Sequence, residues 1–178
     1  RPVMGMYQLD ASAAYQSGEQ TFLITANEGD ARDYEGFGEE ARVSTLTLDP
    51  TAFPGGAPAN LARLTVTNTL GDSGGDADYD ALYAFGARSF TIWNPTTGAV
   101  VYDSGDDFEQ ITAERYPAYF NAGNTDNDLD SRSDAKGPEP EGLALGVVDG
   151  RTLAFIGLER VGGVMVYDVS TPATPVFL

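Results

Sequence analysis

The sequence has no cysteine and no histidine among its 178 residues. These absences exclude thiol nucleophiles, Ser-His-Asp triads and zinc sites built on His or Cys. Any metal ion must therefore be held by oxygen atoms, which favours Ca²⁺, Mg²⁺ or Mn²⁺. Calcium is the cofactor that we expect, because the sequence is rich in carboxylates.

Positive charge is also scarce, since 10 Lys and Arg residues stand against 27 Asp and Glu residues, for a net charge of −17. A nucleic acid or an anionic membrane surface is therefore not an expected partner. No apolar run approaches the ~18 residues of a membrane span. A divalent cation is the natural small partner of such a chain. Solubility is the competing interpretation of the total charge, but it does not explain why the acids cluster.

Long helical patterns are missing as well. Pro117 limits the best helical stretch, residues 107–120, to about two turns. The chain instead has short apolar runs separated by turns that contain many of its 21 Gly and 10 Pro residues, which is typical of an all-β protein. The predicted strand regions are residues 21–26, 42–48, 62–68, 81–86, 89–93, 99–103, 152–158 and 163–169.

An internal repeat organises these runs. "TFLITANE" at 21–28 aligns without a gap with "TLAFIGLE" at 152–159, an offset of 131 residues, and "ALYAFGAR" at 81–88 is a third copy. The unit recurs about every 60–70 residues, which is longer than a usual propeller repeat. Each copy leads to a second run with a similar ending: "LTLDPT" (46–51), "TIWNPT" (91–96) and "MVYDVST" (165–171).

Radially repeated four-stranded sheets explain this repeat best. We predict an all-β segment of a β-propeller with about three blades, approximately residues 1–60, 61–120 and 121–178. Because a propeller needs about four to eight blades to close, the chain should pair with the remaining blades of a larger propeller or with copies of itself. A β-sandwich with chance similarity is the competing fold, but it does not account for the ungapped offset.

Charged residues occupy the same strand-end position in the three copies, namely Glu28, Arg88 and Glu159. The 131-residue offset also aligns Asp10 with Glu141, at the start of the preceding strand. A charge repeated at one position does not fit a core pattern. It predicts a ring of acids contributed by successive blades near one face or around a central channel.

The stretch "SRSDAKGPEPEG" (131–142) gathers three carboxylates around the only lysine of the chain, Lys136. Two prolines flank Glu139 and remove backbone freedom before folding, so the ligands need less ordering when a cation binds. A rigid acidic loop without a ligand is the competing interpretation. The predicted calcium ligands around this stretch are Glu28, Asp134, Glu139, Glu141 and Glu159.

Two acidic loops are further calcium candidates. Alternating oxygen side chains let a curled loop converge on a hard cation at ~2.3–2.6 Å. Neither loop has the EF-hand spacing, and solvated acidic loops are the competing interpretation. The candidate ligands are Asp72, Asp76, Asp78 and Asp80 in residues 71–80, and Asp126, Asp128, Asp130 and Asp134 in residues 124–134.

We interpret residues 26–43 as an acidic insertion between paired strands. Local ion pairs are one interpretation of its mixed charges. The other is a loop over the channel, in which Asp30 joins a metal site and Arg32 faces an anionic ligand.

The sequence resembles the bacterial choice-of-anchor I family in the stretches "TANEGDARDYEGF", "YDALYAFGARSFTIW", "DSGDDFEQITA", "SRSDAKGPEPEG" and "AFIGLERVGGVMVYD". Its members are often named mesenchyme-specific cell surface glycoproteins or, loosely, alkaline phosphatases. The resemblance covers nearly the whole chain and implies a secreted, periplasmic or surface-anchored β-propeller that is longer than this chain. The opening Arg-Pro-Val, without Met, fits a processed form or an interior segment.

The "GPEPEG" stretch is also similar, more weakly, to a strand start in calcium-dependent phytase-like propellers. Acids at the channel mouth of those propellers hold calcium, and the similarity implies that Glu141 is a ligand.

Two functions from different classes fit these features. The first is a non-catalytic, calcium-binding surface module that binds an extracellular ligand. The second is a metal-dependent phosphoesterase, alkaline phosphatase- or phytase-like, in which carboxylate-held calcium activates water and polarises a phosphorylated small molecule. The residues expected to hold such an anion are Arg32, Arg88, Lys136 and Arg160.

Overall fold

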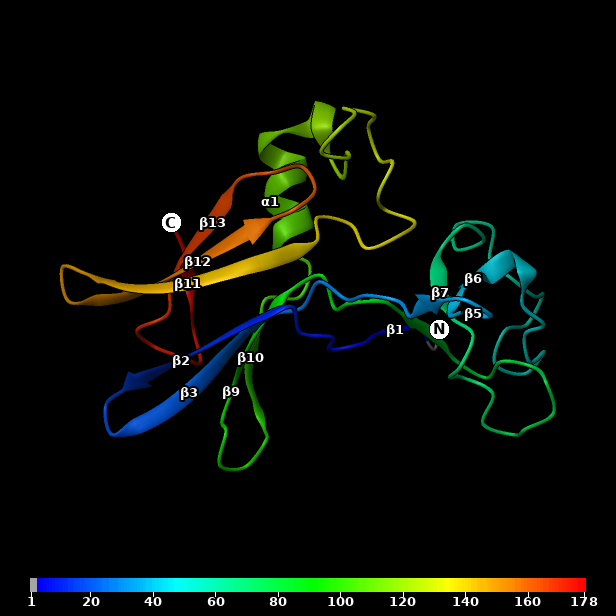
Figure 1. The fold of residues 1–178 in the computed structure, drawn as a ribbon, viewed down its shortest axis with the longest axis horizontal. Coiled ribbons are helices and arrows are strands. Elements are labelled where there is room, and N and C mark those ends of the chain that lie inside the picture. Colours follow the sequence, from blue (N-terminus) through cyan, green and yellow to red (C-terminus); the bar gives the residue numbers. More distant parts are fainter. Residues whose placement is uncertain (1–2) are drawn as a thin grey trace.

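Residues 3–178, which the computed structural model describes, form three four-stranded sheets and one small hairpin (Figure 1). This confirms the all-β prediction. Two of the sheets lie together at one end of the molecule, and the third lies in a separate lobe at the other end.

Sheet I is antiparallel and has the strand order β10-β9-β3-β2. Every second residue of its central strand, Phe22, Ile24 and Ala26, is buried and apolar, as a strand with one face in a core requires. Its strands are β2 (Ala11–Ser17), β3 (Gln20–Ala26), β9 (Phe90–Trp93) and β10 (Val100–Asp103).

Sheet II is also antiparallel and has the order β11-β12-β13-β14. On one of its faces, Ala154 and Ile156 of β12 lie beside Tyr167 and Met165 of β13, and all four are buried. Its strands are β11 (Pro140–Val148), β12 (Arg151–Leu158), β13 (Val164–Asp168) and β14 (Val176–Phe177).

The ungapped repeat corresponds to matching hairpins in these two sheets. An offset of 131 carries β2 onto residues 142–148 of β11 and β3 onto residues 151–157 of β12. Each hairpin then pairs with a third strand, β9 in sheet I and β13 in sheet II. The repeat therefore predicts the shared core of both sheets correctly.

The third sequence copy does not fold as the other two do. Residues 81–88 supply β8 (Leu82–Ala84), which belongs to sheet III, in the order β1-β8-β7-β6. The expected strand at 42–48 is also wrong, because residues 43–45 form a 3-10 helix. The other elements of this lobe are β1 (Val3–Gly5), β4 (Asp33–Tyr34), β5 (Phe37–Gly38), β6 (Glu40–Arg42), η1 (Val43–Thr45) and β7 (Thr65–Thr67).

Three of the four strands of sheet III (β6, β7 and β8) lie within an insertion into sheet I, and the fourth, β1, precedes sheet I in the chain. The chain leaves β3 after Ala26, builds most of the lobe, and returns to β9 at Phe90. A small core of its own, around Val43, Phe53, Val66 and Leu82, stabilises the lobe. The predicted division into segments 1–60, 61–120 and 121–178 stays a prediction, and the structure adds that sheet I draws strands from both sides of residue 60.

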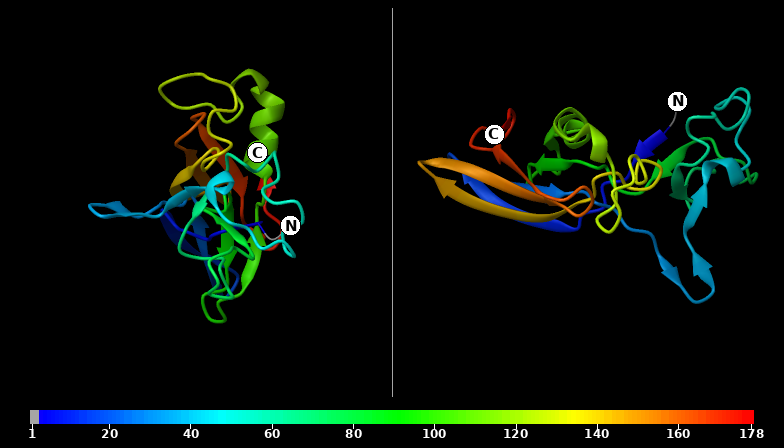
Figure 2. Two further views of the ribbon diagram at one scale, coloured as in Figure 1. Left: turned by 90° about the vertical axis from the view of Figure 1, so that its right-hand side faces the viewer. Right: turned by 90° about the horizontal axis from the view of Figure 1, so that it is seen from above.

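The main core lies between sheets I and II. We call the side of sheet I with Phe22, Ile24 and Ala26 its front face, and the offset makes Leu153, Phe155 and Gly157 the front face of sheet II. The front face of sheet I shares one core cluster with the back face of sheet II, which carries Ala154 and Ile156. The hairpins β2–β3 and β11–β12 consequently lie side by side (Figures 1 and 2).

Helix α1 (Asp107–Arg115) confirms the expected short helix, which ends before Pro117 and the turn η2 (Pro117–Tyr119). Its buried Phe108 packs between Phe90 and Tyr167, with ring centroids 6.0 Å and 6.2 Å away, and so joins both sheets. In residues 3–178, no helix has the length and apolar character needed to cross a membrane.

Candidate metal centre

Four acids at equivalent repeat positions gather where sheets I and II meet. Asp10 and Glu28 flank the β2–β3 hairpin, while Glu141 and Glu159 take the matching places at the β11–β12 hairpin. Carboxylate oxygens of Asp10, Glu28 and Glu141 lie within 4.8 Å of one another. Because the two hairpins pack side by side, acids at equivalent positions of the repeat come together and form a cluster of potential oxygen ligands.

A β-bulge sets the position of Glu141. Pro140 pairs with Leu158 and Leu143 pairs with Ile156, so Glu141 and Gly142 together face one residue of β12. A bulge bends its strand and redirects the side chains that it contains. Glu141 is exposed at this point, so its carboxylate is open to solvent.

Glu139 is the buried acid of the cluster, with no exposed surface. It has a left-handed φ of 52°, which is uncommon for a residue with a side chain, and its carbonyl oxygen accepts a 2.8 Å bond from the Glu159 amide. The prolines at 138 and 140 flank this turn, so the sequence fixes Glu139 beside Glu159. Glu28, Glu139 and Glu159 form a second group of carboxylates with oxygens within 4.8 Å of one another.

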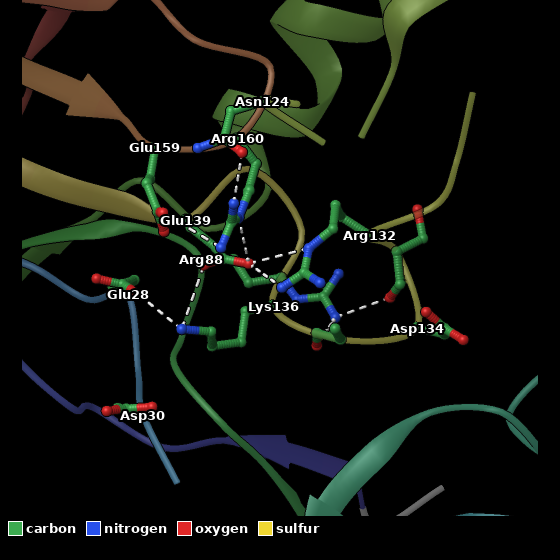
Figure 3. A network of polar contacts seen from close by, with 12 residues as sticks. Glu28, Asp30, Arg88, Asn124, Arg132, Asp134, Lys136, Glu139, Glu159 and Arg160 are labelled. Atoms are coloured by element: carbon green, nitrogen blue, oxygen red, sulfur yellow. Dashed lines mark hydrogen bonds and ion pairs between the residues drawn. The ribbon is translucent and has the colours of Figure 1, made fainter. Parts of the chain in front are cut away.

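Three cations surround Glu139 (Figure 3). Arg132 forms an ion pair with one carboxylate oxygen, and Arg160 Nε lies 3.4 Å from the same oxygen. Lys136 Nζ lies 3.2 Å from the other oxygen, Oε2, and 2.6 Å from Oε1 of Glu28. Oε2 of Glu139 is buried, and the Lys136 ammonium is the cation that faces it.

The acids of this cluster differ in pKa. Burial raises the pKa of Glu28, although the hydrogen bond from Lys136 lowers it in part. Burial and a hydrogen bond shared with Glu139 raise the pKa of Glu159. The pKa of Glu139 is lowered, because Arg132, Glu159 and Lys136 together outweigh its burial. Of this pair, Glu139 therefore favours the ionised form more strongly, and Glu159 takes up a proton first.

The charges of the cluster do not cancel. With every group ionised, Asp10, Glu28, Glu139, Glu141 and Glu159 carry five negative charges, against three positive charges on Arg132, Lys136 and Arg160. Two negative charges remain, which one divalent cation would neutralise. The exposed acids Asp10 and Glu141 lie at the side of the cluster that no basic residue of residues 3–178 pairs with.

Two glycines, Gly29 and Gly86, fix the backbone position of Glu28. A Cβ at Gly86 would lie 1.9 Å from the Glu28 carbonyl oxygen, and a Cβ at Gly29 would lie 2.0 Å from the Gly86 nitrogen. Both glycines have positive φ, 85° at Gly29 and 68° at Gly86. The segment that follows β3 therefore touches the segment that precedes β9 backbone to backbone beside the site, which only glycine permits.

The acidic loop 71–80 is organised mainly by its own backbone. Asp72 accepts hydrogen bonds from the amides of residues 75, 76 and 77 and so shapes the turn. Asp76 lies against Gly74. Carboxylate oxygens of Asp49, Asp78 and Asp80 lie within 4.8 Å of one another. Asp49 was not among the residues predicted from the sequence. The Asp78 pKa is raised by partial desolvation and by the neighbouring acids.

The loop 124–134 does not converge on one point among the described residues. Asp126 accepts a long 3.4 Å bond from the Asp128 amide, and Asp130 bonds Ser133. Asp134 forms ion pairs with Arg42 and Arg63 at 3.1 and 2.7 Å, which tie this loop to the lobe. Asp134 thus has a structural role beside the site, and calcium binding by these acids stays a prediction.

The four predicted anion-binding residues all have carboxylate partners. Arg32 bonds Glu39 at 2.9 Å, and Arg88 bonds Glu109 at 3.1 Å. Arg160 contacts Glu139 and Glu159, and Lys136 contacts Glu28 and Glu139. Asp30 lies near Glu28 (Figure 3) but accepts a bond from the Ala31 amide and belongs to neither group of carboxylates in the described chain.

Arg132 is the residue of the cluster that the sequence reasoning missed. It stands seven residues before Glu139, and the turn of residues 132–137, closed by the Gly137 amide on the Arg132 carbonyl, brings its side chain back onto that acid. A lone arginine in an acidic loop, "DSRSD", was the available signal.

A cavity of about 450 Å³ lies between α1 and the β12–β13 turn. Tyr116, Tyr119, Val161 and Met165 contribute to its wall, and no Asp, Glu, Lys or Arg lines it. Its mainly apolar lining distinguishes it in chemistry from the charged cluster, although Leu158 and Val161 of its wall flank Glu159 and Arg160.

Comparison with known proteins identifies relatives of the chain. It is 36% identical to Gigasin-3a of Magallana gigas over 121 residues, which are 65% of this chain and 42% of that protein. It is 32% identical to a mesenchyme-specific cell surface glycoprotein of Strongylocentrotus purpuratus over 113 residues, which are 56% of this chain and 14% of that protein. The chain thus spans less than half the length of these curated relatives. No solved structure matches it significantly.

The model of the choice-of-anchor I domain matches residues 1–172, nearly the whole chain. This confirms the resemblance found in the sequence motifs. The chain therefore belongs to the choice-of-anchor I family.

Proposed function

We propose that this domain is a calcium-binding module of an extracellular or cell-surface protein, with a binding or structural role. The observation that carries the proposal is the convergence of Asp10, Glu28 and Glu141, whose oxygens lie within 4.8 Å of one another. These acids come from two sheets, so an ion held between them would join the two hairpins.

The donor set fits a hard cation. Calcium takes six to eight oxygen ligands at about 2.3–2.6 Å in flexible geometry, and water supplies the ligands that a protein lacks. Asp10 and Glu141 are exposed, so water can complete the coordination. The two uncompensated negative charges of the cluster match one divalent ion. Oxygen ligands alone also suit calcium better than zinc.

The surface location rests on the family and its relatives. One relative is named a cell surface glycoprotein, and the family model covers nearly the whole chain. For the fold, we propose that sheets I and II are adjacent blades of a larger β-propeller, which the ungapped repeat and the four-stranded antiparallel topology support.

The test is calcium binding by the intact protein, followed by calorimetry and by the melting temperature. Calcium at a hundredfold excess over its dissociation constant should stabilise the fold by about 2.7 kcal/mol. Glu141→Gln should weaken binding, while Glu19→Gln, an exposed acid at the opposite end of the β2–β3 hairpin, should not. Sodium at matched ionic strength controls for screening of the net charge. Equal responses to calcium and sodium, or an unaffected Glu141→Gln, would overturn the proposal.

The phosphoesterase alternative has one observation in its favour, namely that Lys136, Arg132 and Arg160 lie beside the same carboxylates. Against it, each of these cations is already paired with an acid, which leaves none directed at a phosphate. Phosphoesterase activity of the intact protein that depends on calcium and disappears in Glu141→Gln would favour the alternative over a binding role.

A further inference from the structure

The cavity between α1 and the β12–β13 turn has a buried apolar floor and an exposed aromatic rim. Ala122, Leu158 and Met165 of its lining are buried, and we call them the floor. Tyr116 and Tyr119, which form the rim, are 58% and 49% exposed. The volume of about 450 Å³ lies in the range of sites that enclose a drug-sized molecule. The cavity is therefore a candidate site for a small ligand.

Backbone hydrogen bonds hold the walls of this cavity in place. The Val161 amide donates to the Ala122 carbonyl oxygen at 3.1 Å, which ties the β12–β13 turn to the segment that follows η2. The Leu158 amide donates to the Gly163 carbonyl oxygen at 3.1 Å and closes the turn. Val161 has a left-handed φ of 66°, which is an outlier for a β-branched residue. Strained backbone of this kind concentrates at sites that bind ligands.

The surroundings of the cavity are negatively charged. The segments that build it, residues 107–128 and 158–165, contain six acids against two arginines, which leaves a net charge of −4. Both arginines already have partners. Arg160 forms ion pairs with acids of the candidate metal centre, and the Arg115 guanidinium lies 5.1 Å from the ring centroid of Phe177. The local field therefore favours a cationic ligand over an anionic one.

One carboxylate lies beside the wall without a cation of its own. A Cβ added to Gly123, which lines the cavity, would lie 3.0 Å from a carboxylate oxygen of Asp126. Asp126 is exposed, accepts a 3.4 Å bond from the Asp128 amide, and forms no ion pair in the part of the chain that the structure describes. The faces of tyrosine rings also attract cations. The rim thus offers two kinds of group that bind an organic ammonium ion.

We propose that this cavity binds a small organic ammonium compound, whose apolar body lies on the floor and whose ammonium group faces Asp126 and the rings of Tyr116 and Tyr119. The apolar body matches the aliphatic and thioether groups of the floor. The volume favours a free small molecule over a single side chain of a partner protein. No carboxylate of the candidate metal centre lines the cavity, so the proposal does not rest on calcium binding.

The test compares compounds that share a phenyl ring on a two-carbon chain and differ in charge. Phenethylammonium, phenethyl alcohol and phenylacetate are titrated into the intact protein by calorimetry, at fixed ionic strength and without calcium. Phenethylammonium should bind about tenfold more tightly than the alcohol, and phenylacetate should bind more weakly than either. Ethylammonium, which has the charge without the ring, controls for general attraction to an acidic protein and should not bind measurably.

Variants of the intact protein locate the site. Val164 lines the cavity and is 62% exposed, so Val164→Trp should fill the cavity and abolish binding of both phenethylammonium and the alcohol. Asp126→Asn should remove most of the preference for the ammonium compound and leave binding of the alcohol unchanged. Tyr116→Leu should weaken binding of the ammonium compound more than that of the alcohol. Glu19→Gln, an exposed acid at the far end of the β2–β3 hairpin, should change neither.

Equal or tighter binding of the alcohol to the parent would overturn the proposal, because the cavity would then be a neutral apolar site. Binding of phenethylammonium that persists in a folded Val164→Trp protein would place it elsewhere and overturn the proposal too. Absence of binding by every compound has the same consequence. The acetylated amide of lysine represents a side chain of a partner protein, and tighter binding of that compound than of phenethylammonium would contradict a free small molecule as the occupant.

Discussion

The Lys136 ammonium lies 2.6 Å from Glu28 Oε1, and Glu28 is the acid that both groups of carboxylates share. The pair comes from distant parts of the chain, since 108 residues separate them. Lys136 has a raised pKa, because its bonds to Glu28 and Glu139 outweigh burial, so it stays charged. The only lysine of the chain therefore acts as an internal cation within the candidate metal centre.

Lys136→Met should tighten calcium binding and weaken the calcium-free fold. The Lys136 ammonium competes with a metal ion for the carboxylate of Glu28, so its removal frees that carboxylate to bind calcium. Its removal also leaves Glu28 and Glu139 without this cation, which destabilises the calcium-free fold. We expect a gain of about tenfold to 150-fold in calcium affinity, since one hydrogen bond between charged groups is worth about 1.5–3 kcal/mol. Calorimetry at fixed pH measures the gain, and Lys136→Arg, which keeps the charge, should bind calcium like the parent.

Weaker calcium binding in Lys136→Met would mean that Lys136 organises the site rather than competes for it. If neither the parent nor Lys136→Met binds calcium, the proposed metal site itself is wrong. The two outcomes are distinct, because the first requires measurable binding by the parent.

The site was partly predictable, because it follows from the repeat. The alignment of residues 21–28 with 152–159 places Glu28 and Glu159 at matching strand ends, and the hairpins bring them together. The same alignment pairs Asp10 with Glu141. What the alignment does not contain is Arg132, whose side chain reaches Glu139 only through an irregular turn of residues 132–137. No periodicity describes such a turn.

The insertion of sheet III was not predictable from strand patterns. "LTLDPT" at 46–51 resembles the endings of true third strands, but its residues make only an isolated bridge, between Leu48 and Tyr79. Residues 81–88 resemble β3 in sequence, yet they pair with β1 and β7. A short apolar run indicates that a segment can form a strand. Which sheet the strand joins depends on its tertiary contacts, and the sequence pattern does not contain them.

Calcium affinity should fall as the pH is lowered from 7 to 5. The pKa values of Glu28 and Glu159 are raised above their ordinary 4.5, mainly by burial. Their protonated forms stabilise the calcium-free fold at low pH, and this stability is lost as the pH rises through the folded pKa values. Calcium needs the ionised forms, so protons compete with it in the same window.

Binding isotherms at pH 5, 6 and 7 measure this effect. The dependence on pH should be smaller in Glu28→Gln, which removes one of the two titrating groups. Affinity that is independent of pH between 5 and 7 would show that neither Glu28 nor Glu159 is a ligand.

Glu39→Gln should destabilise the inserted lobe without changing calcium binding. Glu39 is nearly buried and accepts bonds from the Arg32 backbone and side chain, from Thr67 and from Thr69. The Arg32 bond, opposed by burial, lowers the Glu39 pKa to about 2. The stability from this ionised group is present above the ordinary value of 4.5 and is lost as the pH falls towards about 2.

Replacement of that carboxylate by an amide should cost about 1.5–3 kcal/mol, the value of hydrogen bonds to a charged group. Urea denaturation of the parent, Glu39→Gln and the exposed Glu40→Gln at neutral pH measures the cost. An equal loss in Glu40→Gln would contradict a specific role for the Glu39 pairing.

Gly86→Ala should disrupt the candidate site through the backbone. Gly86 and Gly36 both have positive φ, 68° and 86°, so alanine is strained at either position. They differ in surroundings, because a Cβ at Gly86 would lie 1.9 Å from the Glu28 carbonyl oxygen, whereas a Cβ at Gly36 would meet nothing within 4 Å. Gly36→Ala is therefore a matched control for the strain alone.

We expect Gly36→Ala to lose about 1–3 kcal/mol of stability, the cost of an unfavourable backbone conformation. Gly86→Ala should lose more, because relief of its contact requires the segment that carries Asn27 and Glu28 to move away from Gly86. That movement would also displace Glu28 from Asp10 and Glu141, so calcium affinity should fall in Gly86→Ala and stay unchanged in Gly36→Ala. Denaturation midpoints and calorimetry on both variants separate the two effects. Unchanged calcium affinity in a folded Gly86→Ala protein would show that the position of Glu28 does not matter to the site.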